Sequence, residues 1–262
     1  MTTPHERRLV AITHVPSPTM QDYEHTFVDD QAIDVELACR QHEGYRAALR
    51  ACGAAVTLLD VNSAMPDCVF VEDTAIVLDE VAVMMSPGAV SRRREPAGIE
   101  PELAKYRPIA RITLPATIDG GDVVVSGKSV YVGQSARTND LGIATLRALL
   151  APYGYTVTGI FVHGCLHLKT ACSALPDGRF LVNPTWIDAS PLPASKLMRV
   201  PESEPWAGDV LVIDEQIIVS DAFPETIALL RTAGWRVVPV SVSEFAKAEG
   251  GVTCLSLVFR DR

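Results

Sequence analysis

Short apolar runs bounded by turn residues recur along the whole chain, and they predict β-strands. The predicted strands cover residues 55–59, 68–78, 81–85, 109–114, 122–125, 129–132, 155–162, 180–182, 210–213, 216–219, 235–240 and 255–259. Helical stretches lie between several of these runs. A mixture of this kind indicates an α/β fold.

Three helices are predicted from residues that begin and end helices. They cover residues 33–51, the segment from Asn139 to about Gly154, and the segment from Pro224 to the residue before Gly234. Asparagine is a preferred N-cap residue, proline suits the first helical turn, and glycine commonly follows the last turn.

A turn followed by two strands repeats along the chain at a spacing of roughly 40 to 50 residues. The repeated turns contain Glu72-Asp73, Gly121-Asp122, Leu166-His167, Gly208-Asp209 and Thr253-Cys254. The fifth unit lacks its second strand, which residues 10–13 could supply, closing a ring of five units with strands from both ends of the chain. We therefore expect one domain over residues 1–262. Five similar hairpins in a larger sandwich remain the alternative.

The composition is that of a globular protein, with 48% hydrophobic and 21% charged residues. Lysine and arginine number 23 against 32 aspartates and glutamates, so the formal net charge is −9. This balance argues against a nucleic-acid partner and against an anionic membrane surface. It would mildly attract a cationic small molecule, but composition alone favours the other interpretation, an acidic cytosolic protein that its charge keeps soluble.

The cysteine pattern indicates neither a disulfide scaffold nor a zinc site, because no C-x-x-C pair occurs. The six cysteines are Cys39, Cys52, Cys68, Cys165, Cys172 and Cys254. The apolar run at residues 9–12 is too short for a signal peptide, and no run approaches a membrane span. We therefore expect a protein of the reducing cytoplasm.

Two acidic clusters interrupt strand-like runs. Residues 67–73 end in Glu72-Asp73, and residues 117–122 place Asp119 beside two glycines. Carboxylates in such positions could hold a cation, and glycines allow a ligand close to the backbone. Ordinary solvated turns are the alternative interpretation at each site.

A histidine and a cysteine occupy equivalent points of the repeat. His167 is flanked by leucines, and Cys254 follows a glycine-rich approach to the last strand. Each could be an ordinary packing residue. If the ring closes, however, the repeated turns meet at one end of its axis, and a thiol, an imidazole and several carboxylates face one cavity. Nucleophilic catalysis on a cationic carbon needs that arrangement.

Taken together, these segments resemble the dimethylarginine dimethylaminohydrolase family of the pentein, or guanidino-group-modifying, superfamily. The matching segments follow the family order and are residues 70–73, 86–93, 118–122, 132–139, 166–170 and 250–254. The resemblance implies a single pentein catalytic domain, an α/β, five-bladed, pseudo-symmetric propeller of ββαβ units. It agrees with the repeat.

The resemblance also implies a catalytic trio. Cys254 matches the nucleophile, and His167 matches the general acid and base. Asp119 stands at the acidic position that orients the histidine and the guanidinium, where some relatives have glutamate.

Residues that bind the substrate are implied in the same way. Asp73, with Glu72, matches the carboxylates that clamp the guanidinium, and Asp67 matches a residue that receives the α-amino group.

Arg92 and Arg137 match the pair that binds the α-carboxylate, a function suited to the fork of arginine. Ala248 falls where the family uses a backbone carbonyl, and residues 20–30 correspond to a lid.

The activity implied is hydrolysis of Nω-methylated arginine to L-citrulline and dimethylamine or methylamine, through a covalent thiouronium on the cysteine. The implied partner is this small cationic amino acid, with no metal and no organic cofactor. A homodimer is left open. Two other functions also stay open, an arginine deiminase-like hydrolase of unmethylated arginine or another substituted guanidine, and a non-catalytic binding protein of pentein fold.

Overall fold

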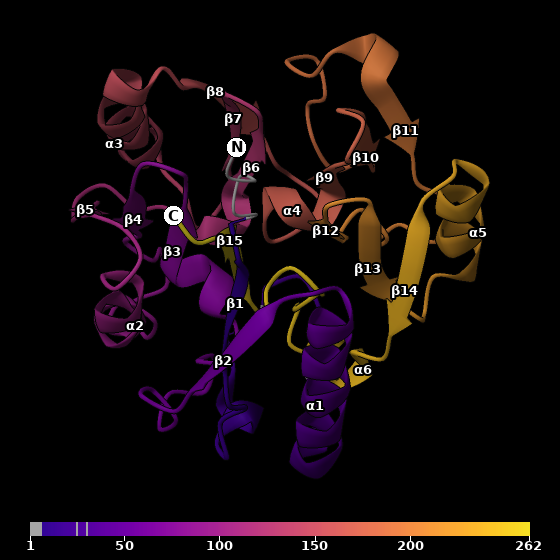
Figure 1. The fold of residues 1–262 in the computed structure, drawn as a ribbon, viewed down its shortest axis with the longest axis horizontal. Helices are drawn as coiled ribbons and strands as arrows, with labels where there is room; N and C mark the ends of the chain where they lie inside the picture. Colours follow the sequence, from indigo (N-terminus) through magenta and orange to yellow (C-terminus); the bar gives the residue numbers. More distant parts are fainter. Residues whose placement is uncertain (1–6, 25, 30) are drawn as a thin grey trace, which may run out of the picture.

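A computed structural model describes residues 7–24, 26–29 and 31–262 of the chain. Within these ranges the strands form five three-stranded sheets, arranged around a common centre (Figure 1). Each sheet combines one antiparallel and one parallel strand pair. The α/β fold expected from the apolar pattern is therefore present.

Four sheets are built from strands that are consecutive in the chain. The first two comprise β3 (Ala75–Val77), β4 (Ala82–Met84) and β5 (Ile109–Arg111), then β6 (Val123–Ser126), β7 (Ser129–Gln134) and β8 (Thr156–Phe161). The next two comprise β9 (Cys172–Ala174), β10 (Phe180–Val182) and β11 (Leu197–Arg199), then β12 (Leu211–Ile213), β13 (Gln216–Ser220) and β14 (Arg236–Val240).

The fifth sheet joins segments from opposite ends of the sequence, in the order β15 (Leu257–Arg260), β1 (Leu9–His14) and β2 (Ala55–Leu59). Strand β1 lies in the centre, antiparallel to β15 and parallel to β2. The prediction that residues 10–13 supply the missing strand is confirmed.

The first strands of the five units, β3, β6, β9, β12 and β15, surround a cavity of about 300 Å³. Glu72, Lys169 and Thr253 also line this cavity. We call it the central cavity. Each of these five strands is the first strand after a repeated turn, and so the five strands occupy equivalent positions around the cavity.

Amphipathic helices cover the outer strands. In α3 (Asp140–Leu150), Ile143, Leu146 and Leu150 are buried at helical spacing and pack in one core cluster with Val130 and Val132 of β7. Helices α1 (Val35–Ala51) and α5 (Pro224–Thr232) likewise contribute their buried faces to separate clusters. Each core cluster combines strands of two neighbouring sheets, so the cores lie between the sheets.

The three predicted helices are present. The Asn139 side chain accepts a hydrogen bond from the Gly142 N–H at 2.8 Å, and Pro224 begins α5. Helix α1 begins two residues later than predicted because Asp34 caps it. No helix in the described ranges is long and apolar enough to span a membrane.

The predicted strand over residues 68–78 is wrong in its first part. Val71–Thr74 forms a 3-10 helix, and only Ala75–Val77 is a strand. The pattern missed strands β9 and β11. It also missed α2 (Glu95–Leu103), α4 (Leu168–Ala171) and α6 (Ser243–Ala246). Two prolines hide the helical pattern of α2, and α4 and α6 are only four residues long.

Replacing Ile12 of β1 should test the importance of the central strand that closes the fifth sheet. Ile12 is 0% exposed, so Ile12→Ala leaves a cavity and should lower the free energy of unfolding by about 2 to 5 kcal/mol. Leu58 in the neighbouring strand β2 is 41% exposed, so Leu58→Ala should cost about 0.5 kcal/mol or less. Urea unfolding of both variants measures the difference, and equal losses would contradict it.

Candidate active site

Carboxylates in the repeated turns bind backbone N–H groups of the next unit. Three bonds follow this pattern, namely Gly121 N–H to Asp73 at 3.0 Å, Leu168 N–H to Asp122 at 2.9 Å, and Thr253 N–H to Asp209 at 3.1 Å. The Glu72 N–H donates to the Cys254 carbonyl at 3.2 Å and joins the last turn to the first. The turns therefore form one connected group.

The predicted site residues meet at a small cavity of about 20 Å³, which we call the catalytic cavity. All of them line it except Glu72 and Asp119. The predicted residues that line it are Asp67, Asp73, Arg92, Arg137, His167, Ala248 and Cys254. The convergence that a closed ring implies is therefore observed.

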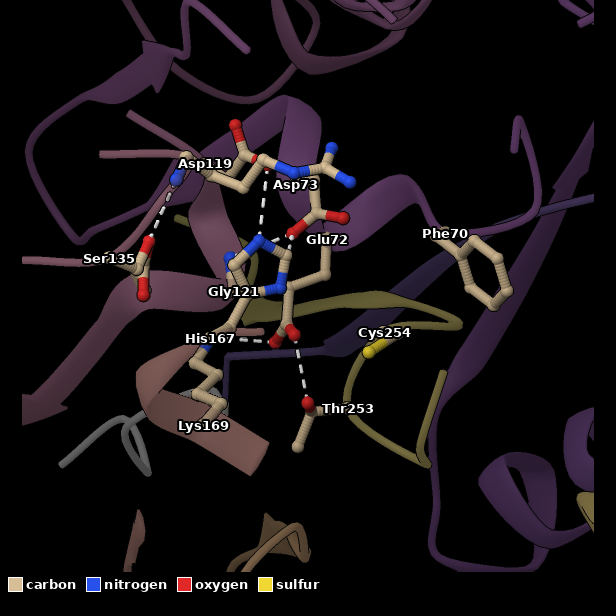
Figure 2. A network of polar contacts seen from close by, with 12 residues as sticks. Phe70, Glu72, Asp73, Asp119, Gly121, Ser135, His167, Lys169, Thr253 and Cys254 are labelled. Carbon is tan, nitrogen blue, oxygen red and sulfur yellow. Dashed lines mark hydrogen bonds and ion pairs between the residues drawn. The ribbon is translucent and has the colours of Figure 1, made fainter. Parts of the chain in front are cut away.

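His167 is held between two carboxylates (Figure 2). Its Nε2 lies 3.1 Å from Oδ2 of Asp119, and its Nδ1 lies 3.7 Å from Oδ1 of Asp73. Asp119 is 0% exposed, and its other oxygen accepts the Gly88 N–H at 2.9 Å. Asp119 is thus placed behind the imidazole, where it fixes the orientation of the ring.

The carboxylates determine the charge of His167. Burial alone lowers the pKa of the imidazole, but Asp73, the hydrogen bond with Asp119, and Asp122 outweigh it and raise the pKa to about 9. Burial raises the pKa of Asp73, and His167 and Arg92 outweigh it, so the net direction is downward. At neutral pH the site therefore contains an imidazolium with a carboxylate on each side.

The Cys254 thiol is in the opposite situation. Burial raises its pKa well above the ordinary value, and the negative charges of Asp209, Glu72 and Asp73 raise it further. The Gly251 N–H is 3.4 Å from Sγ and stabilises the thiolate only partly. The thiol therefore stays protonated until another positive charge arrives.

Glu72 does not line the catalytic cavity. Its carboxylate accepts hydrogen bonds from Lys169 Nζ at 2.6 Å and from the Thr253 hydroxyl at 2.8 Å. These three residues instead line the central cavity. Lys169 and Thr253 stand in segments that matched the family, but neither received a role from the sequence.

The two predicted arginines differ in what they contact. Arg92 is buried, and its guanidinium binds Asp73 at 2.5 Å, Glu95 at 2.8 Å and the Phe70 carbonyl at 3.0 Å. The Arg137 guanidinium binds no partner among the residues that the structure describes. Arg137 is therefore free to bind a ligand, whereas Arg92 mainly neutralises buried carboxylates.

The sequence did not identify Glu95 as part of the site. It begins α2, a helix that was not predicted, and so no signal placed its carboxylate beside Arg92. Burial raises the pKa of Glu95, and Arg92 opposes that shift.

The predicted lid, residues 20–30, contributes Glu24 to the catalytic cavity, while His25 and Asp30 lie outside the described residues. The Glu24 N–H donates to Asp67 at 3.3 Å, and the Thr26 N–H donates to Glu249 at 2.8 Å. Burial raises the pKa of Asp67 to about 6, although Arg92 opposes the shift. About 20 Å³ holds little more than one water molecule, so the cavity in this conformation is too small for a ligand as large as an amino acid.

Three donor atoms from Asp73, Asp119 and His167 lie within 4.8 Å of one another, a spacing that could hold a metal ion. The raised pKa of His167 opposes this use, because an imidazolium has no lone pair for a metal. The cluster is better suited to holding a proton on the imidazole.

Comparisons with known proteins found similar sequences and similar structures. A family model described as "N,N dimethylarginine dimethylhydrolase, eukaryotic" matches residues 17–169. An N(G),N(G)-dimethylarginine dimethylaminohydrolase from Streptomyces coelicolor is 38% identical over 252 residues, 96% of this chain and 97% of that protein. The protein of the same name from Pseudomonas aeruginosa is 33% identical over 86% of this chain and 90% of its own length.

Two solved structures are also similar. A mutant of the Pseudomonas aeruginosa enzyme complexed with citrulline has a TM-score of 0.89 and 30% identity, covering 97% of this chain and 99% of that one. A dimethylarginine dimethylaminohydrolase adduct with S-methyl-L-thiocitrulline has a TM-score of 0.90 and 31% identity, covering 97% and 100%.

The charge of His167 should depend on Asp119. In an NMR titration of the unmodified protein, the imidazole should lose its proton near pH 9. In Asp119→Asn it should lose its proton at a lower pH, because the carboxylate that is hydrogen-bonded to the ring has been replaced by a neutral amide. The folded protein holds this proton more tightly than the unfolded chain does, because folding raises the pKa of His167 from the ordinary 6.5 to about 9. The protonated imidazole therefore contributes fully to the free energy of unfolding below about pH 6.5, and the contribution is lost as pH rises through about 9. Loss of the proton at or below pH 6.5 in the unmodified protein would contradict the assignment.

Proposed function

Because the chain belongs to the dimethylarginine dimethylaminohydrolase family, we propose that it hydrolyses Nω-methylated L-arginine to L-citrulline and dimethylamine or methylamine. The observation that carries this proposal is that Cys254, the imidazolium of His167 and the carboxylates of Asp67 and Asp73 line one cavity. A relative complexed with citrulline and another in an adduct with S-methyl-L-thiocitrulline support it.

For the fold we propose the finer description that the family implies, a five-bladed pentein propeller over residues 1–262 in one domain. The five three-stranded sheets around the central cavity support it. The nucleophile must remain a free thiol, so the reducing cytoplasm is the compartment we propose. The homodimer stays a prediction.

Binding of the substrate would compensate the excess of negative charge at the site. In this proposal Asp73 faces the guanidinium, Asp67 receives the α-amino group, and Arg137 binds the α-carboxylate as a bidentate partner. Arg92 neutralises Asp73. A direct contact of Arg92 with the α-carboxylate of the substrate remains a prediction, as does a contact of the substrate with the backbone carbonyl of Ala248. Glu72 would act on the guanidinium only by the long-range attraction of its negative charge, because Lys169 and Thr253 already donate hydrogen bonds to its two carboxylate oxygens.

The cationic substrate would also activate the nucleophile. Burial and neighbouring carboxylates raise the pKa of Cys254 in the free protein. A guanidinium placed against the sulfur stabilises the thiolate and lowers that pKa. The thiol then loses its proton to solvent, because His167 already carries one, and the reactive pair of thiolate and imidazolium therefore forms mainly when substrate is bound.

In the first half of the reaction the thiolate attacks the guanidinium carbon and a carbon–sulfur bond forms. The carbon–nitrogen bond to the methylated nitrogen breaks as His167 gives its proton to the departing amine. A thiouronium attached to Cys254 remains, and His167 is left neutral.

In the second half, neutral His167 takes a proton from a water molecule, whose oxygen attacks the thiouronium carbon. The carbon–sulfur bond breaks and returns the thiolate, and the remaining hydroxyl proton passes to solvent, where the amine takes it up. The product carries a carbonyl oxygen in place of the methylated nitrogen and is citrulline. Asp119 holds the imidazole in the orientation that both proton transfers require.

The function is tested by Cys254→Ser with asymmetric dimethylarginine, monomethylarginine and arginine supplied side by side. Citrulline formation should fall to at most about one ten-thousandth, because a serine hydroxyl is not ionised by the bound cation. Cys39→Ser, at an exposed cysteine, should keep full activity. Turnover of the methylated substrates by Cys254→Ser near the unmodified rate would overturn the proposal. Preference for unmethylated arginine would favour the deiminase-like alternative.

Arg137→Ala should weaken binding more than catalysis. Losing one charged hydrogen bond to the α-carboxylate, worth about 1.5 to 3 kcal/mol, already raises KM by about 10- to 150-fold, so at least this increase is expected, with a smaller change in kcat. Arg94→Ala removes the same charge from an exposed position and should leave KM unchanged. Steady-state kinetics on both variants check this. An unaltered KM in Arg137→Ala would mean that Arg137 has a structural role.

A further inference from the structure

A second, larger cavity lies beside the catalytic cavity, with a volume of about 480 Å³. We call it the lid pocket. Its walls come from Val28 of the lid, the adjacent Gln31, the turn at residues 220–223, helix α6, and the loop at residues 249–252. Pockets that bind small molecules commonly have such a volume, and the catalytic cavity is far smaller.

The walls of the lid pocket are largely apolar. Trp206 and Phe223 provide aromatic surface, and Val242 and Val252 provide buried aliphatic surface. Aromatic faces attract cations as well as apolar groups. A ligand with an apolar body therefore fits these walls.

The charge in the lid pocket is negative. Asp209 lines it and is 7% exposed, with one oxygen bound to the Thr253 N–H and the other beside Gly251. Asp221 lies exposed on the wall and forms no ion pair within the described part of the chain. The only cationic side chain among the described lining residues is Lys247, whose amine already binds Glu244 at 2.7 Å and the Ala32 carbonyl at 3.0 Å. Burial and the negative charge of Glu72 raise the pKa of Asp209 to about 7, so a cationic ligand in this pocket would meet the exposed carboxylate of Asp221 and would favour the ionised form of Asp209.

The lid pocket and the catalytic cavity share Glu249 and Gly250. Glu249 has φ of 59°, a left-handed conformation that costs energy in a residue other than glycine. Its carboxylate accepts the N–H groups of Thr26 and Phe27 and so ties the lid to the loop that leads to Cys254. The shared loop couples the two cavities.

We propose that the lid pocket is a second binding site, which takes a small organic ammonium ion with an aromatic or aliphatic body and stabilises the closed lid. Val28 of the lid and the adjacent Gln31 form part of the wall. The complete pocket therefore exists only while the lid is closed. A ligand that binds one conformation better shifts the population toward it. Occupation of the pocket should therefore slow access to Cys254.

Binding is tested by calorimetric titration of the full chain with benzylammonium, benzyl alcohol and methylammonium. Benzylammonium should bind saturably, and the other two about tenfold more weakly or worse, because each lacks either the charge or the apolar body. Asp221→Asn should weaken benzylammonium binding about threefold, and Ala222→Trp, which fills the pocket from an exposed position, should abolish it. Asp60→Asn removes an exposed charge outside the pocket and should have no effect.

Coupling to the lid is tested by the rate at which iodoacetamide alkylates each cysteine. Saturating benzylammonium should slow alkylation of Cys254 and leave that of the exposed Cys39 unchanged. In Ala222→Trp it should alter neither rate. The binding site is overturned if no saturable binding occurs, or if Asp221→Asn and Ala222→Trp bind benzylammonium as the unmodified chain does. The coupling is overturned if saturating benzylammonium leaves the Cys254 rate unchanged or raises it. Neither readout requires turnover, so failure of the proposed hydrolysis would be seen separately.

Discussion

The hydrogen bonds that join the repeated turns of neighbouring units are the interaction on which the rest of the structure depends. Each sheet has only three short strands and shares its apolar core with the neighbouring sheets, so a single sheet is marginal in isolation. The bonds from Asp73, Asp122 and Asp209 to the following units tie the sheets together around the central cavity. They also place the site, because the same turns carry His167 and Cys254. Assembly and chemistry therefore use the same residues.

The concentration of carboxylates that this arrangement requires is balanced by a fixed set of cations. Arg92 neutralises Asp73 and Glu95, Lys169 neutralises Glu72, and His167 is charged because of the acids beside it. Cys254 lacks such a partner, so its pKa is raised. A cationic ligand beside Cys254 would supply the positive charge that this site lacks, and that charge would stabilise the thiolate.

The sequence predicted the units and the residues of the site better than it predicted their contacts. Strand periodicity and the repeat identified five units and the closing role of residues 10–13, because apolar alternation and turn residues are local signals. The pattern missed α2, whose prolines hide it, and with it Glu95 as the partner of Arg92. It also could not show that Glu72 binds Lys169 and Thr253, which come from other units. Pairings between units depend on tertiary geometry that no local pattern contains.

The central position of β1 in the fifth sheet has a consequence for how the chain folds. Leu9 and Val10 pair with Arg260 and Phe259, so the two partners are separated by almost the entire sequence. Strand β1 can pair with β2 early, but its other edge has no partner until β15 reaches it, while the other four sheets are formed by strands close in sequence. Contacts of such long range slow folding, and an open strand edge is exposed to wrong partners in the meantime. We therefore expect the pairing of β1 with β15 to form late in folding, and misassembly to concentrate at the open edge of β1 before that step.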